Sequence, residues 1–197
     1  MLNQHATIND IISSTLESNK TTKESMRAGG VFHVQCFDKD GNLKWEDKSH
    51  NLVVNQGLKD MNDKYFSGTT YTATWYLGLI TGPGSGTTFA AGDTLASHAG
   101  WTEFTNYTVG GSAVRGTAVF AAPTSASTVT TTTATAITYT MTGSATVYGC
   151  FLVTGTGAVS TISSTAGTLY SEGNFSTAKT VTSGDTVTVT YSTTATS

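Results

Sequence analysis

The sequence predicts an all-β domain, a jelly-roll-like two-sheet sandwich that carries one short helix and an N-terminal arm. Only 12% of the 197 residues are Asp, Glu, Lys or Arg, and Thr is abundant, a composition that favours strands over helices. Short stretches of alternating apolar and polar residues recur along the chain, separated by glycine-containing turns. Strands do not alternate with helical patterns, so a parallel α/β sheet is not expected.

The predicted arm covers residues 1–29 and precedes a predicted sandwich domain of residues 30–197. Its apolar residues follow the spacing of one helix face: Ile8, Ile11, Ile12 and Leu16. A helix this short is not stable in isolation. We therefore expect the stripe to be the interface with a partner, although a helix that packs on its own domain or a frayed terminus fits the pattern equally well. Gly29 and Gly30 are expected to act as a hinge.

The domain is expected to open with a β-hairpin formed by strands 31–37 and 43–54. Asp38 at the first turn position and Gly41 at the fourth suit a type I turn followed by a left-handed residue. A calcium loop fits this turn poorly, because the glycine comes two residues too early. The hairpin would place His33 roughly opposite Asp47, as a cross-strand pair.

Residues 55–66 form the one helix predicted within the domain. Asn55 can cap its first turn. The apolar residues of this segment recur on one face, as in an amphipathic helix: Leu58, Met61, Tyr65 and Phe66.

The remaining strands are predicted from apolar alternation and from the turns between them. Their ranges are 71–81, 101–107, 115–122, 128–141, 145–154, 167–175 and 186–192. The alternation is clearest in two of these strands, and it predicts an inward face made of Val129, Ile137, Tyr139 and Met141 in one and of Val187, Val189 and Tyr191 in the other.

The two cysteines, Cys36 and Cys150, lie in apolar strand-like runs, so we expect them to be buried core residues. A disulfide between them stays open but is unsupported by the sequence. The first thirty residues lack the pattern of a secretory signal, and no segment has the length of apolar sequence that spans a bilayer. We therefore expect a protein made in a reducing cytoplasm, with no membrane partner.

The sequence predicts no enzyme, no catalytic residue, no metal site and no cofactor. The four histidines and two cysteines lack zinc-ligand spacing, and the glycine-rich stretches match no phosphate-binding motif. Asp93, Ser97 and His98 are triad-type residues, but Asp93 is better explained as the cap of a helical turn. Glu46 and Asp47 are adjacent and should point to opposite faces of a strand. A net charge of −3 gives no case for binding nucleic acid.

Several stretches together resemble a family of structural proteins. They are residues 32–54, 55–66, 74–80, 90–105, 167–176 and 180–192. Taken in this order, they resemble the head decoration or cement proteins of tailed double-stranded DNA bacteriophages. Residues 1–29 and the threonine run at 128–140 depart from the family pattern.

The resemblance implies a non-enzymatic virion protein with a jelly-roll-type sandwich. Such a protein would bind the major capsid protein on the outer surface of a phage head, bridge capsomers, and associate with further copies of itself. It would be located on the capsid surface of the virion after synthesis in the host cytoplasm.

Two other function classes stay open at the level of sequence. The chain could be a tail or tail-fibre component that recognises a host surface, although it lacks the long repeats of a fibre shaft. It could also be a carbohydrate-binding module, because it contains Trp45, Trp75 and Trp101. Aromatic residues in sandwich strands are, however, more often core residues than sugar platforms.

Overall fold

The computed structural model describes residues 27–71, 74–82, 87–123 and 129–196, and it confirms the all-β two-sheet sandwich. One sheet has the strand order β2-β1-β12-β9-β6, with β8 also paired to β12, and the other has the order β3-β11-β10-β4-β5, with β7 also paired to β4. The strands are β1 (Arg27–Phe37), β2 (Leu43–His50), β3 (Leu52–Val53), β4 (Tyr76–Thr81), β5 (Thr102–Glu103), β6 (Tyr107–Thr108), β7 (Gly116–Thr117), β8 (Val129–Thr132), β9 (Ile137–Met141), β10 (Ala145–Thr154), β11 (Thr168–Val181) and β12 (Thr186–Thr196). A single described helix, α1 (Asn55–Tyr65), follows β3.

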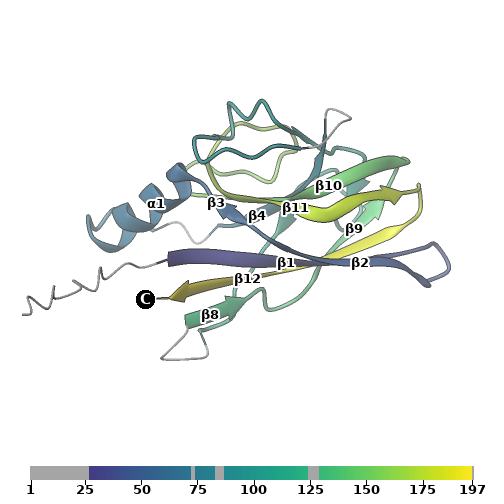
Figure 1. The fold of residues 1–197 in the computed structure, drawn as a ribbon, viewed down its shortest axis with the longest axis horizontal. Coiled ribbons are helices and arrows are strands. Elements are labelled where there is room, and N and C mark those ends of the chain that lie inside the picture. The colour runs from purple at the N-terminus through teal and green to yellow at the C-terminus, as the bar shows by residue number, and fades with distance from the viewer. Residues whose placement is uncertain (1–26, 72–73, 83–86, 124–128, 197) are drawn as a thin grey trace, which may run out of the picture.

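The first and last strands of the domain pair with each other along their whole length. β1 runs antiparallel to β12 from the pair Arg27 and Thr196 to the pair Phe37 and Thr186. The start of β1, the C-terminus and α1 consequently lie toward the same end of the sandwich (Figure 1). Gly29 and Gly30 belong to this ladder, opposite Thr194 and Thr193. The expected glycine hinge is therefore wrong, because the sheet holds both residues.

The predicted inward faces of the strands are confirmed where the structure describes them. Ile137, Tyr139 and Met141 on β9 are buried, as are Val187, Val189 and Tyr191 on β12. β1 contributes Phe32, Val34 and Cys36 to the same core. The side chain of Val129 lies outside the described part of the structure. A strand period of two with one face on the core explains the pattern.

The second sheet is buried on both faces near its centre. Its inner face belongs to the main core, whereas its outer face carries a second cluster that includes Ile80, Phe151 and Val153. Leu95 and Trp101, from the segment between β4 and β5, also belong to this cluster. A sheet covered on both sides requires continuous apolar strands, which explains why the run from Leu77 to Ile80 shows no alternation.

The hairpin turn forms as predicted, but the return strand is divided. The backbone N–H of Gly41 donates to the carbonyl of Asp38 at 3.0 Å, and Gly41 has a φ of 84°. The expected strand 43–54 ends at His50 because the chain changes sheets at Asn51. His50 pairs with Val31 in the first sheet, whereas Leu52 pairs with Glu172 in the second.

Three other predicted strands are also shorter, two of them because the chain changes sheets. In the segment 101–107, Glu103 pairs with Ile80 in one sheet and Tyr107 pairs with Met141 in the other. The segment 115–122 forms a strand only over Gly116–Thr117, and Phe120 then makes an isolated bridge with Thr133, next to β8 of the other sheet. The predicted strand 71–81 begins only at Tyr76.

The threonine-rich segment 128–141 forms two strands along the same neighbour, β12. Thr132 pairs with Ser192 and Ile137 with Val189, so this segment has two more residues than β12 between the two pairs. Thr133 bonds the segment between β8 and β9 to β12. Its N–H donates to the carbonyl of Tyr191, and its hydroxyl accepts from the N–H of Tyr191. β10 matches its predicted range, whereas β11 and β12 extend beyond theirs, to Val181 and Thr196.

The extension of β11 closes one side of the sandwich against β2. Asp47, buried on β2, accepts hydrogen bonds from Ser176 and lies 2.9 Å from the ammonium of Lys179. His33 is opposite Lys48 and not Asp47, and its ring nitrogen lies 2.6 Å from Glu46. As predicted, Glu46 and Asp47 point to opposite faces, one exposed and one buried.

Both cysteines are free and fully buried, which confirms their predicted place in the core. Burial, followed by the negative charge of Asp185, raises the pKa of the Cys36 thiol to about 12. Burial also raises the pKa of Cys150. We therefore predict that neither thiol reacts with a thiol-specific probe at pH 8 while the domain is folded, and that both react in denaturant. Labelling of either cysteine in the native protein faster than global unfolding would contradict their placement.

Candidate docking surface

Helix α1 is held against the second sheet by a close approach of two backbones. A Cβ on Gly57 would lie 2.3 Å from the carbonyl oxygen of Tyr170 on β11, so only glycine fits at this helix position. The expected cap is wrong: Val54, in an extended conformation, is the N-cap, and no side chain caps the helix. The chain instead bonds Asn55 N–H to the carbonyl of Ala91.

The apolar residues of α1 do not form a buried face. Of the four that recur at helical spacing, only Met61 packs against the core, where it accepts a hydrogen bond from the hydroxyl of Tyr170 at 3.4 Å. Leu58 is 41% exposed, and the helix ends on Tyr65 and Phe66, which are 83% and 74% exposed. Because Gly57 carries the contact with the sheet, these larger side chains are left in water.

Three of these side chains, Met61, Tyr65 and Phe66, line a groove of about 430 Å³ at the C-terminal end of α1. We call it the α1 groove, and its apolar lining is Met61, Tyr65, Phe66, Tyr71 and Trp75. The Tyr65 and Phe66 rings meet edge to face at 5.1 Å. Polar residues of the helix, Asp60 and Lys64, form the rim and lie 3.7 Å apart as an ion pair.

Trp75 forms the fixed wall of the α1 groove. Its ring packs edge to face on Tyr170 at 5.0 Å and on Phe120 at 5.3 Å. Its indole N–H donates to the hydroxyl of Tyr71 at 3.1 Å, and Tyr71 itself is 58% exposed. A groove with a fixed aromatic wall and an apolar lining is suited to bind apolar side chains, because aromatic residues supply large contact area at small cost in side-chain entropy.

The predicted interface residues Ile8, Ile11, Ile12 and Leu16 lie outside the described residues, so the structure does not place them. The α1 groove itself was not predicted from the sequence. The apolar spacing within 55–66 pointed to one face of the helix, but it did not show that most of that face stays in water.

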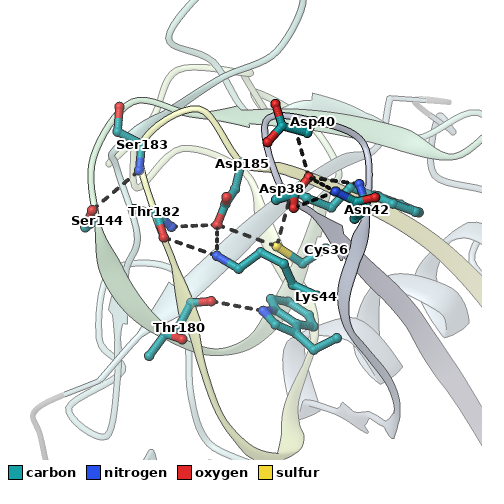
Figure 2. A network of polar contacts seen from close by, with 12 residues as sticks. Cys36, Asp38, Asp40, Asn42, Lys44, Ser144, Thr180, Thr182, Ser183 and Asp185 are labelled. Atoms are coloured by element: carbon teal, nitrogen blue, oxygen red, sulfur yellow. Dashed lines mark hydrogen bonds and ion pairs between the residues drawn. The ribbon is translucent and has the colours of Figure 1, made fainter.

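The polar side chains buried elsewhere in the described structure hold segments of the fold together. Figure 2 shows the cluster around Asp185, at the turn between β11 and β12. Its carboxylate accepts from the N–H of Thr182 at 2.7 Å and from the ammonium of Lys44 at 2.5 Å. The hydrogen bond to Asp185 raises the pKa of Lys44. The Cys36 sulfur lies 3.9 Å from the same carboxylate, so the cluster joins this turn to β1 and β2.

A second buried cluster is the ion pair between Arg115 and Glu103. The guanidinium donates to both carboxylate oxygens, at 2.8 and 2.7 Å, and to the carbonyl of Ser164 at 2.8 Å. The N–H of Ser163, a residue with a φ of 62°, donates to the same carboxylate. The arginine lies over the ring of Phe151, at 5.2 Å from its centroid. The pair therefore joins three loop segments beside the second core cluster.

A third buried polar contact involves Glu172 on β11, which is fully buried. The indole N–H of Trp101 donates to its carboxyl group at 2.7 Å. Burial, followed by the negative charge of Asp93, raises the pKa of Glu172 to about 8. The carboxyl group is thus largely protonated at neutral pH.

The triad-type residues in the sequence are not arranged as a triad. His98 stacks on Trp101 with ring centroids 3.8 Å apart, and its Nδ1 lies 3.0 Å from the carbonyl of Trp101. Asp93 accepts from the N–H of Ala90, and the backbone of Ser97 pairs with Thr94. The expected helical turn at Asp93 is wrong, since this segment forms turns and a short bridge.

Within the described ranges, no group of three or more His, Cys, Asp and Glu side chains is placed to hold a metal ion. The described helix lacks the length and the apolar character needed to cross a membrane. Comparison of the chain with family models, curated proteins and solved structures finds no match.

The pKa of Glu172 predicts how stability depends on pH. The pKa of Glu172 is about 8 in the folded state and 4.5, the ordinary value, in the unfolded state. Between pH 4.5 and about pH 8, the folded state therefore keeps a proton that the unfolded state has released. The free energy of unfolding should therefore fall by about 1.4 kcal/mol per pH unit in this window. Denaturant unfolding of Glu172→Gln should lack this fall, whereas Asp40→Asn, on an exposed side chain, should retain it. An unchanged slope in Glu172→Gln would contradict the assignment.

The buried ion pair predicts a large effect of removing one partner. Glu103→Ala leaves the guanidinium of Arg115, only 1% exposed, without its counter-charge, and should lower the free energy of unfolding by about 3–5 kcal/mol. Asp40→Ala removes an exposed ion pair with Lys39 and should cost less than about 1 kcal/mol. Denaturant unfolding measures both effects. An equal loss of unfolding free energy in the two variants would show that the buried Arg115–Glu103 pair does not stabilise the fold more than the exposed pair does.

Proposed function

We propose that this chain is a non-enzymatic structural protein of a virion, a decoration or cement protein that binds the outer surface of a tailed-phage head and bridges capsomers. The observation that carries the proposal is the α1 groove, an exposed aromatic surface at the C-terminal end of α1. Contiguous apolar surface of this kind marks an interaction site. A protein present in many fixed copies has neighbours that cover such a surface.

The buried polar side chains of the described structure support a structural part. The buried polar groups of Asp185, Arg115 and Glu172 each bind a neighbouring segment of the chain. The net charge of −3 agrees with a protein partner and not with nucleic acid. The proposed partners are the major capsid protein and further copies of this chain, with the apolar stripe of the arm among the contacts.

The proposal predicts a copy number and a mechanical effect. Heads assembled without this chain should bind the purified protein to saturation at hundreds of copies per particle, as the symmetry of a shell requires. Loaded heads should then release their DNA at a higher temperature than bare heads. Quantitative mass spectrometry of sedimented particles and a thermal release assay measure both.

Heads that already carry the protein are the matched control, and they should bind no more of it. Binding of only tens of copies or fewer, or binding to tails and not to heads, would contradict the proposal. The second of these outcomes would favour a tail or tail-fibre component instead.

A further inference from the structure

We propose that the α1 groove of one copy binds the N-terminal apolar stripe, Ile8, Ile11, Ile12 and Leu16, of a neighbouring copy. This inference rests on the proposed function, which it deepens by naming the partner of the groove. It starts from an exposed apolar groove in the described structure and from a sequence pattern in the same chain that could fill it. That pattern is the set of four aliphatic residues at helical spacing.

The chemistry of the two surfaces is complementary. The groove presents Met61 and Trp75 at its wall and the exposed rings of Tyr65, Phe66 and Tyr71 around it. Aliphatic side chains at positions i, i+3, i+4 and i+8 are the anchors by which an amphipathic segment fills an apolar groove. The burial of each large aliphatic side chain contributes roughly 1.5–3 kcal/mol. Several such anchors can offset the cost of ordering the segment.

The place where the described chain begins makes this contact accessible. β1 starts at Arg27, toward the end of the sandwich where α1 lies (Figure 1). Ten residues, 17–26, separate Leu16 from Arg27, and they span at most roughly 33–36 Å. A compact domain of this size has a radius of gyration of roughly 15 Å. The link therefore reaches across about one domain, as far as an adjacent copy in an array.

In the proposed shell, the stripe that fills a groove is expected to come from a neighbouring copy and not from the same copy. Copies held side by side on a shell present their arms to one another at fixed distances, so each contact forms at a high effective concentration. Exchange of an identical segment between copies is a low-cost way to join them. An arm folded onto its own groove would cover both surfaces without linking any copies.

Two variants separate the groove from the stripe without altering the core. Tyr65→Ser/Phe66→Ser changes two side chains that are 83% and 74% exposed, so folding should be unaffected. Ile11→Asp/Ile12→Asp introduces charge into the stripe. Leu43→Ser, at the first position of β2, where the side chain is 53% exposed, is the matched control.

The test is complementation in solution, measured by light scattering during size-exclusion chromatography and by analytical ultracentrifugation. The full chain and Leu43→Ser should self-associate as concentration rises, whereas each of the two double variants should associate at least tenfold more weakly. Mixed together, the two variants should form a one-to-one complex, because one supplies an intact groove and the other an intact stripe.

Three results would overturn the inference. They are a full chain that stays monomeric, a groove variant that self-associates as strongly as the control, and a mixture that forms no complex. A monomeric full chain whose groove becomes accessible to an apolar dye only in Ile11→Asp/Ile12→Asp would identify an arm bound to its own domain. Because this test uses no phage heads, its failure leaves the binding of the protein to heads as a separate measurement.

Discussion

The antiparallel pairing of β1 with β12 is the constraint on which the rest of the structure depends. Eleven residue pairs join the two strands, which come from opposite ends of the described chain. β1 positions β2 on its other side, and β12 positions β8 and β9. Contacts between residues this far apart in sequence form late and require the whole chain. The pairing also brings the start of β1 and the C-terminus to one end of the sandwich (Figure 1).

Buried polar groups then fix the segments that the strands alone would leave loose. Asp185 holds the turn before β12, Asp47 holds the extension of β11 against β2, and the Arg115–Glu103 pair holds three loops together. Each group is satisfied mainly by a partner distant in sequence. Buried charges are costly unless they are paired, so these contacts specify one arrangement of the loops. In the described structure, these contacts all join groups of the chain itself.

The α1 groove differs from these clusters because, among the described residues, the rings of Tyr65, Phe66 and Tyr71 are mostly exposed. Gly57 brings the helix backbone onto the sheet, which turns Tyr65 and Phe66 away from it. Exposed apolar surface of this kind is typical of interaction sites, which is why we propose that an assembly covers it. The proposal of an arm exchanged between neighbours on a shell follows from this contrast.

The sequence by itself determined which side chains face inward and where the first hairpin turns. The alternation of Ile137, Tyr139 and Met141 and the turn from Asp38 to Gly41 depend on local geometry, which neighbouring residues encode. Only the tertiary structure decided where the chain changes sheets, at Asn51 and again between Glu103 and Tyr107. Alternation reports which face of a strand is apolar, but it does not report which sheet that strand joins. For the same reason, helical spacing in 55–66 predicted α1, whereas the exposure of Tyr65 and Phe66 depended on the approach of Gly57 to Tyr170.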